Sequence, residues 1–101
     1  MKKLASVITM GVLLGLSGAV LAAGDVAAGK TKSAVCAGCH GATGISVAPI
    51  YPNLKGQKEA YLIKQLKAFR DGTRTDPMMS PMAKPLTDAD IDNVSAYFSS
   101  L

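Results

Sequence analysis

Residues 57–70 carry an apolar pattern with the period of an amphipathic α-helix. Leu62, Leu66 and Phe69 occupy positions i, i+4 and i+7, a spacing that places their side chains on one helical face. Gly72 follows, and a glycine at this place is typical of a helix C-cap. The pattern therefore predicts a helix over residues 57–70 with one buried face.

A second apolar stripe predicts another helix in the last part of the sequence. Its members are spaced i, i+3, i+7 and i+10: Ile91, Val94, Phe98 and Leu101. Thr87 precedes the stripe and is a favourable N-cap, and Asp88 and Asp90 suit the positive end of a helix dipole. We therefore predict that this helix begins directly after Thr87.

The rest of the pattern indicates one short helix and two irregular segments. Asp25 is a favourable N-cap for a helix over residues 25–35, which would run directly into Cys36. Glycines and prolines interrupt residues 41–56 and residues 73–86, so both segments are expected to be loops. The pattern predicts an all-α domain with three main helices, two long loops and no strand.

The first 22 residues have the pattern of a secretory signal peptide, in which two lysines precede an apolar run over residues 4–21. We expect cleavage after Ala22, with cleavage after Ala23 as the alternative, so that residues 23–101 form the functional domain. An uncleaved membrane anchor is the competing interpretation, because the run is nearly long enough to span a bilayer. The small residues near its end favour cleavage.

Charge and size narrow the functions open to this domain. The 101 residues include 11 Lys or Arg and 7 Asp or Glu, a net charge of +4, which becomes +2 without Lys2 and Lys3 (9 − 7). The sequence has no basic tract interleaved with aromatic residues, so nothing indicates nucleic-acid binding. A domain this small buries little apolar surface and usually needs a disulfide, a metal or a cofactor.

Both cysteines and the single histidine lie in the segment "AVCAGCHG", residues 34–41. A thiol–disulfide oxidoreductase would place such a cysteine pair after a strand in a βαβ unit, and no strand is predicted. A zinc site needs about four ligands, whereas the cysteines and histidine of this chain number three, and Cys39 and His40 are adjacent. Both interpretations are therefore disfavoured.

Covalent attachment of a haem accounts for all three residues. Cys36 and Cys39 lie at positions i and i+3, on one face of a helical turn, and can form thioethers with the two haem vinyl groups. His40 follows directly and can ligate the iron from one side. A signal peptide would supply the export that this attachment requires. The segment therefore predicts one haem c, with its iron, per chain.

Three methionines of the segment 73–86 could complete the iron coordination: Met78, Met79 and Met82. Methionine often serves as a flexible filler of core gaps. An electron-carrying haem, however, needs a second axial ligand, and methionine raises the reduction potential relative to histidine. The other two methionines lie in the predicted signal peptide, so we expect the ligand to come from this group of three.

With these residues, the sequence resembles the class I c-type cytochromes of the bacterial periplasm. The resemblance covers the whole domain after the signal peptide. It is carried by the segments "AVCAGCHG", "PNLKGQ", "AYLIKQLKAFRDGTRTDPMMSPMAKPLTDADI" and "VSAYF". The sequence is especially similar to one half of the di-haem cytochromes c4 and to related mono-haem proteins. The di-haem members contain two such domains, and this sequence contains one.

The resemblance assigns roles to individual residues. It implies that Cys36 and Cys39 are the thioether cysteines and that His40 is the proximal iron ligand. It implies that the carbonyl of Pro52 receives the other imidazole N–H, a contact that would fix the tautomer. It also implies Met79 as the second axial ligand, with the other two methionines of the segment as alternatives.

The resemblance further implies the small cytochrome c fold, with helices and loops wrapped around one haem. Gly29 would permit a close crossing of the first and last helices, at Tyr97 or Phe98. Several apolar residues are expected to wall the haem: Leu54, Leu62, Leu66, Phe69 and Ile91. Arg70 and Arg74 are expected to contact the haem propionates, with a solvated helix end as the alternative.

The function that the resemblance implies is that of a soluble periplasmic one-electron carrier, which is not an enzyme. Its expected partners are redox proteins such as respiratory complexes, terminal oxidases or reductases, with transient contact to membrane complexes and no nucleic acid. One alternative is a haem-bearing accessory subunit of a membrane or periplasmic oxidoreductase complex. Another is a haem enzyme with an open iron site, against which the methionine-rich segment argues.

Overall fold

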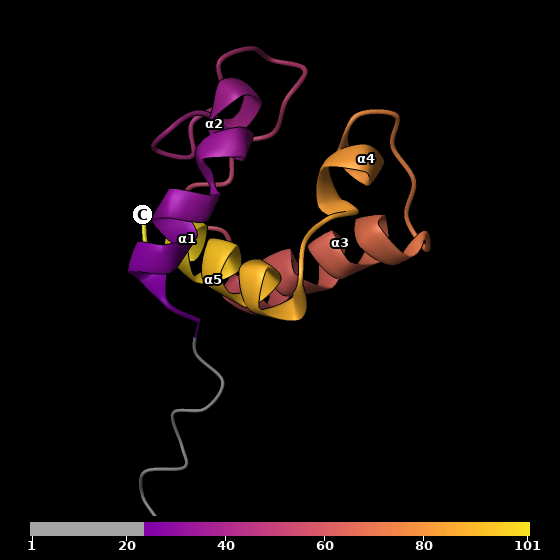
Figure 1. The fold of residues 1–101 in the computed structure, drawn as a ribbon. Coiled ribbons are helices and arrows are strands. Elements are labelled where there is room, and N and C mark those ends of the chain that lie inside the picture. Colours follow the sequence, from indigo (N-terminus) through magenta and orange to yellow (C-terminus); the bar gives the residue numbers. More distant parts are fainter. Residues whose placement is uncertain (1–23) are drawn as a thin grey trace, which may run out of the picture.

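The computed structural model describes residues 24–101, which form five helices and contain no strand (Figure 1). These are α1 (Val26–Lys32), α2 (Ala34–His40), α3 (Glu59–Asp71), α4 (Met79–Ala83) and α5 (Asp88–Ser99). The predicted all-α fold class is confirmed, although five helices replace the three predicted. The predicted signal peptide lies outside the described residues.

The helix predicted over residues 25–35 is divided in two. Ser33 is the C-cap of α1 and the N-cap of α2, and its hydroxyl donates a hydrogen bond of 2.9 Å to the carbonyl of Lys30. A side-chain bond of this kind competes with the regular helix, which explains the break. The predicted N-cap is confirmed, because the Asp25 carboxylate accepts a hydrogen bond of 3.1 Å from the N–H of Ala28.

Helix α3 begins two residues later than predicted and ends close to the predicted place. Gly72 is its C-cap, in the left-handed conformation with φ 90°, and its N–H donates to the carbonyl of Ala68 at 3.0 Å. Leu62 and Phe69 are buried and Leu66 is half-buried. The predicted apolar face of this helix therefore does face the interior.

The segment 73–86, predicted to be irregular throughout, contains the short helix α4. Pro81 is tolerated there because it lies in the first turn, where its missing N–H would have no partner within the helix. The Asp76 carboxylate accepts hydrogen bonds of 2.8 Å from the N–H groups of Met78 and Met79. A helix this short offers too few apolar repeats for periodicity to predict it.

Helix α5 begins directly after Thr87, as predicted. The Thr87 hydroxyl accepts a hydrogen bond of 3.0 Å from the N–H of Asp90, and the Asp90 carboxylate accepts one of 3.0 Å from the N–H of Thr87. The two bonds form a capping box, which satisfies two N–H groups at the helix start. Ile91, Val94 and Phe98 are buried, so the predicted stripe faces the core.

Helix α1 crosses α5 closely at Gly29 (Figure 1). A Cβ atom at Gly29 would overlap the backbone carbonyl of Asn93 and press on the Tyr97 side chain, so the crossing requires a residue without a side chain. The Asn93 side chain also accepts a hydrogen bond of 2.8 Å from the N–H of Asp25. The close crossing that the resemblance implied is thus present.

The buried core has two parts, both along α5. One cluster comprises Leu62, Val94, Tyr97 and Phe98, and the other comprises Phe69, Ala83, Leu86 and Ile91. Leu66 packs against both clusters and links them. Among the helices of residues 24–101, none is both long enough and apolar enough to cross a membrane.

Candidate haem site

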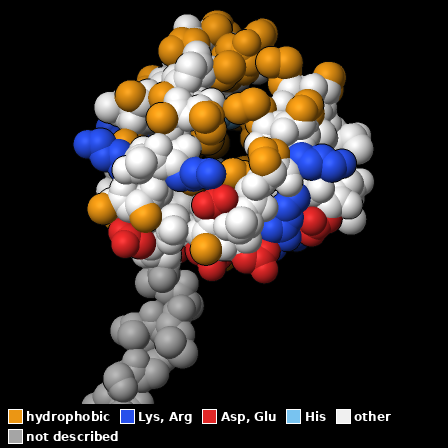
Figure 2. Space-filling model, viewed as in Figure 1, with side chains coloured by type: hydrophobic (Ala, Val, Ile, Leu, Met, Phe, Trp, Pro, Cys, Tyr) orange, Lys and Arg blue, Asp and Glu red, His pale blue; other side chains and the backbone are white. Residues whose placement is uncertain are grey.

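A cavity of about 550 Å³ lies against this core. Its walls come from α2 and the loop after it, from α3, from the segment around α4 and from α5. Most of the predicted site residues line it: Cys36, Cys39, His40, Pro52, Leu54, Leu66, Phe69 and Met79. Figure 2 shows a hollow in the surface bordered by hydrophobic side chains. The fold therefore gathers residues from distant parts of the chain around one space.

The two cysteines lie one turn apart on α2 and line the same cavity. Both are free thiols and both are half-buried. Burial raises the pKa of the Cys36 thiol. The neighbouring Cys39 thiol raises the pKa of Tyr51. The thiols are therefore arranged to react with a single group held in the cavity.

His40 is the last residue of α2 and is 6% exposed. Its Nδ1 lies 2.8 Å from the carbonyl oxygen of Pro52. Because a carbonyl can only accept a hydrogen bond, Nδ1 carries the proton and the lone pair of the imidazole is on Nε2. Gly41 ends the helix with φ 85°, where a Cβ atom would overlap the carbonyl of Ile45. The chain thereby turns sharply behind the imidazole, which is free to bind a metal through Nε2.

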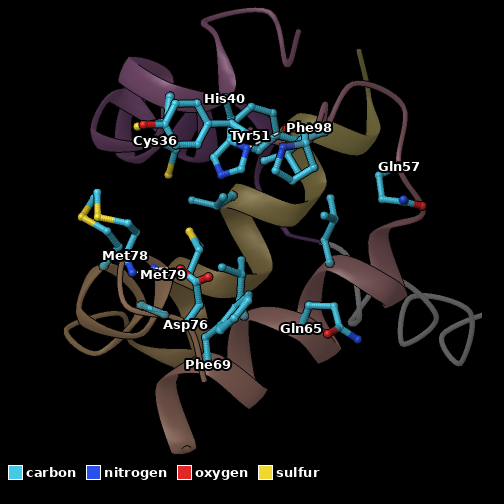
Figure 3. A pocket seen from close by; sticks show the side chains of 18 of the residues that line it. Cys36, His40, Tyr51, Gln57, Gln65, Phe69, Asp76, Met78, Met79 and Phe98 are labelled. Carbon is cyan, nitrogen blue, oxygen red and sulfur yellow. Dashed lines mark hydrogen bonds between the residues drawn. The ribbon is translucent and has the colours of Figure 1, made fainter. Parts of the chain in front are cut away.

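The three methionines of the α4 segment all line the cavity, but they differ in burial. Met79 is half-buried and packs against the core cluster that contains Phe69. Met78 and Met82 are 58% and 41% exposed. Figure 3 shows the Met79 side chain and the His40 imidazole on opposite sides of the cavity, directed toward one another. Met79 is therefore the methionine best placed to face His40.

The apolar side chains predicted to wall a haem divide into two groups. Leu54, Leu62, Leu66 and Phe69 line the cavity. Ile91 is fully buried, packs with Phe69 in the core cluster and is not part of the lining. Ile91 thus supports the wall from behind.

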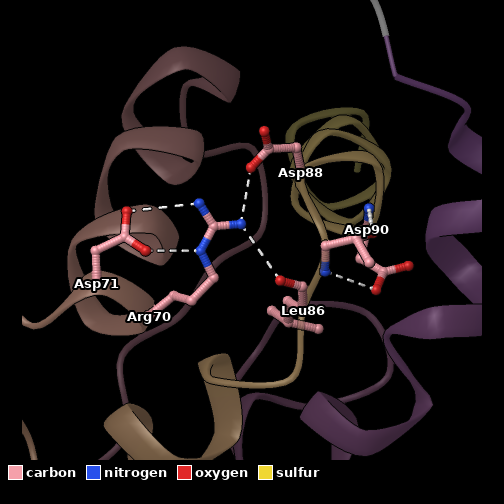
Figure 4. Close-up of polar contacts among 6 residues, drawn as sticks. Arg70, Asp71, Leu86, Asp88 and Asp90 are labelled. Atoms are coloured by element: carbon pink, nitrogen blue, oxygen red, sulfur yellow. Dashed lines mark hydrogen bonds and ion pairs between the residues drawn. The ribbon is translucent and has the colours of Figure 1, made fainter.

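Arg70 does not line the cavity, although it was predicted to contact a haem propionate. Its guanidinium forms ion pairs of 2.8 Å with Asp71 and Asp88 and donates a hydrogen bond of 3.3 Å to the carbonyl of Leu86 (Figure 4). The hydrogen bonds from Arg70 lower the pKa of both carboxyl groups. Arg70 therefore connects the end of α3 to the start of α5.

Arg74 is the arginine that does line the cavity. Its guanidinium lies 4.5 Å from the centre of the Phe69 ring, over the ring face, and it donates a hydrogen bond of 2.6 Å to the side chain of Gln65. A cation over an aromatic face is a favourable contact. This arrangement provides a positive group at the cavity wall.

Sequence reasoning missed several polar residues of the lining. Tyr51 lies beside the His40 imidazole, with ring centres 6.4 Å apart. Because Tyr51 directly precedes Pro52, a residue already assigned to the site, the sequence could have indicated its place in the lining. Gln65 lies within the apolar face of α3, where a polar residue can indicate a cavity. Asp76 and Ser95 gave no such signal, because their positions depend on how α4 and α5 pack.

The residues present fit a covalently bound haem. Two thiols and a buried imidazole lie on one wall, a thioether lies opposite, and the remaining lining is mostly apolar. The volume falls in the range of roughly 300–1,000 Å³ typical of small-molecule and cofactor sites. Together, the all-α fold and this constellation define a c-type cytochrome.

Comparison with known proteins gives the family. Residues 26–101 match the family model described as Cytochrome c, and the chain belongs to this family. Members of the family bind haem c covalently with its iron, and Cys36, Cys39 and His40 form the corresponding Cys-x-x-Cys-His motif.

Individual relatives agree with this assignment. Cytochrome c4 of Pseudomonas aeruginosa is 51% identical over 87 residues, which cover 86% of this chain and 43% of that protein. Cytochrome c-554(548) of Halomonas halodenitrificans is 51% identical over 81 residues, which cover 77% of this chain and 98% of that protein. The crystal structure of reduced recombinant cytochrome c4 from Pseudomonas stutzeri matches with a TM-score of 0.73 and 45% identity, over 77% of this chain and 46% of that chain. The chain thus spans about half the length of the cytochromes c4 that it matches.

Proposed function

We propose that this protein is a one-electron carrier with one haem c, whose iron is ligated by His40 and Met79. The observation that supports this proposal most strongly is that the imidazole, held by Pro52, and the half-buried thioether of Met79 face one cavity from opposite sides (Figure 3). With haem bound, His40 and Met79 would both hold the iron and would leave no position on it for a substrate. Bound haem supplies the Fe(III)/Fe(II) couple.

The chain's own residues orient and shield the site. The Pro52 carbonyl accepts the proton of Nδ1, which fixes the imidazole ring and makes Nε2 a stronger donor to a metal. Methionine as the opposite ligand favours a higher reduction potential than a second histidine would. Leu54, Leu66 and Phe69 give the cavity an apolar lining, and low polarity around a bound haem would be a further control on the potential.

The proposed contact surface for redox partners is the rim of the cavity. Val35, Ile50 and Met78 line the cavity and are 60%, 79% and 58% exposed. Respiratory complexes, terminal oxidases or reductases are the proposed partners, and an apolar rim suits brief contacts that bring two redox groups close. The alternative of a permanently docked haem subunit uses the same residues.

The proposed location is the periplasm. This proposal rests on the signal-peptide pattern of residues 1–22. It also rests on the fact that covalent haem attachment requires an exported chain whose cysteines are free thiols.

Carbon monoxide tests the carrier proposal against an enzyme with an open iron site. The reduced protein is expected to keep its absorption spectrum under carbon monoxide, because Met79 occupies the sixth position. The Met79→Ala variant is the control, and it is expected to bind carbon monoxide and so to show that the assay detects an open site. Ready binding by the unaltered protein would contradict the proposal.

A further inference from the structure

We propose that Asp76 is a positioning residue for Met79, holding the backbone from which the methionine reaches the iron. This inference rests on the proposed role of Met79 as the axial ligand. The Asp76 carboxylate lines the cavity, and a single oxygen, Oδ2, accepts hydrogen bonds of 2.8 Å from the N–H groups of both Met78 and Met79. Figure 3 shows Asp76 directly beside these two methionines.

The backbone of Asp76 adds two further bonds to the same turn. Its N–H donates to the Ser80 hydroxyl at 3.0 Å, and its carbonyl accepts from the N–H of Ser80 at 3.0 Å. Four hydrogen bonds therefore join Asp76 to residues 78–80. They fix the point at which the Met79 side chain leaves the backbone.

Helix α4 needs such support because it has five residues. A helix of this length is unstable by itself, since forming the first turn fixes several residues for few hydrogen bonds. Its far end is held by Ala83, which is fully buried in the core. At its near end the carboxylate satisfies two N–H groups that would otherwise have no partner within the helix.

The charge of the carboxylate strengthens these contacts. The hydrogen bonds from Met79 and Met78 lower the pKa of Asp76, as expected when N–H groups stabilise the ionised form. Hydrogen bonds to a charged acceptor are stronger than those between neutral groups. The carboxylate is therefore well suited to restrain the backbone next to a ligand that forms a single bond to the iron.

The test is the ease with which an external ligand displaces Met79. Imidazole is added to the oxidised holoprotein, and loss of the methionine–iron absorption band is followed. Asp76→Ala is expected to bind imidazole about tenfold more tightly than the unaltered protein, since loss of two hydrogen bonds weakens the ligated state. Asp76→Asn keeps a side-chain oxygen as acceptor and is expected to restore most of the resistance.

Asp90→Ala is the matched control. The Asp90 carboxylate also accepts a backbone N–H at a helix start, that of Thr87, but it lies at α5 and outside the cavity lining. This variant is expected to lower the free energy of unfolding and to leave the imidazole affinity unchanged. The comparison separates positioning of Met79 from a general loss of helix stability.

The outcomes distinguish the two proposals. A methionine–iron band in the unaltered protein together with unchanged imidazole affinity in Asp76→Ala would overturn the role of Asp76 alone. Absence of the band from the unaltered protein would overturn ligation by Met79 and this inference with it. If Asp76→Ala fails to fold, amide hydrogen exchange in the unaltered holoprotein decides: protected Met78 and Met79 amides support the role, and exchange at the rate of an unstructured peptide overturns it.

Discussion

Nδ1 of His40 lies 2.8 Å from the carbonyl oxygen of Pro52, and this bond joins the end of α2 to the loop that follows it. It assigns the ring proton to Nδ1 and directs Nε2 to the cavity. The thiols of Cys36 and Cys39 line the same cavity from the same helix. One short helix thus carries both proposed points of covalent attachment and one proposed iron ligand, and the proposed second ligand lies elsewhere in the fold.

Replacement of either cysteine by serine is expected to leave one thioether. A serine hydroxyl is a far weaker nucleophile than a thiol and does not add to a vinyl group under the same conditions. The pyridine haemochrome spectrum of the purified protein reports the number of thioethers, which should be two in the unaltered protein and one in Cys36→Ser or Cys39→Ser. Ala37→Ser is the control and should keep both. Two thioethers in either cysteine variant would contradict the attachment sites.

Histidine in place of Met79 is expected to lower the reduction potential. Imidazole donates more strongly to Fe(III) than a thioether does, and axial ligands set haem potentials over about 0.8 V, so a fall on the order of 0.1 V or more is expected. Potentiometric titration measures this change. Met82→His is the matched control, because Met82 lines the same cavity from the same helix. A lower reduction potential in Met82→His, with an unchanged potential in Met79→His, would identify Met82 as the ligand instead.

Alanine at Gly29 is expected to destabilise the protein. The new Cβ would overlap the backbone of Asn93, and separating α1 from α5 to accommodate it should cost about 1–3 kcal/mol of the free energy of unfolding. Gly38→Ala is the control, because a Cβ there meets no atom within 4 Å and the helix gains about 0.5–1 kcal/mol. Urea unfolding of both holoproteins checks the prediction. Equal stability of the two variants would contradict the close crossing.

Glutamine at Arg70 is expected to make stability less sensitive to acid. Arg70 lowers the pKa of Asp71 and Asp88 from their ordinary value of 3.8. Groups with a lowered folded-state pKa stabilise fully above the unfolded value, and this contribution is lost as the pH falls through the folded-state values. The unaltered protein should therefore exceed Arg70→Gln in free energy of unfolding at pH 7, and the difference should shrink near pH 3.

Urea unfolding at the two pH values measures this difference. Lys84→Gln is the control: Lys84 forms no ion pair within residues 24–101, and its removal should give nearly the same change at both pH values. If the free energy of unfolding differs between the unaltered protein and Arg70→Gln by the same amount at pH 7 and at pH 3, this would argue against the two ion pairs in solution.

The parts of the structure that the sequence predicts are those determined by nearby residues. Thr87 and Asp90 are three apart and cap α5 by themselves, and Cys36 to His40 carry the attachment motif within one turn. Pro52 and Met79 were predicted through the resemblance to a family, since their roles depend on a residue far along the chain. The structure supplies the spatial relation in each case.

The features that the sequence did not predict depend on packing or on local competition. Ser33 divides the first predicted helix because its hydroxyl donates a hydrogen bond to the carbonyl of Lys30. A serine in a helical pattern does not by itself predict that the helix will break there. Helix α4 forms because Asp76 and the buried Ala83 hold its two ends. Arg70 pairs with Asp88, and only folding brings α5 to the end of α3.

Proton NMR of the reduced protein tests the central claim most directly. In the diamagnetic Fe(II) state the haem ring current shifts the methyl group of an axial methionine far upfield of all ordinary protein signals. We expect one such three-proton signal in the unaltered protein and in Met82→Ala, and none in Met79→Ala. Absence of the signal from the unaltered protein, or its survival in Met79→Ala, would contradict an electron carrier ligated by His40 and Met79.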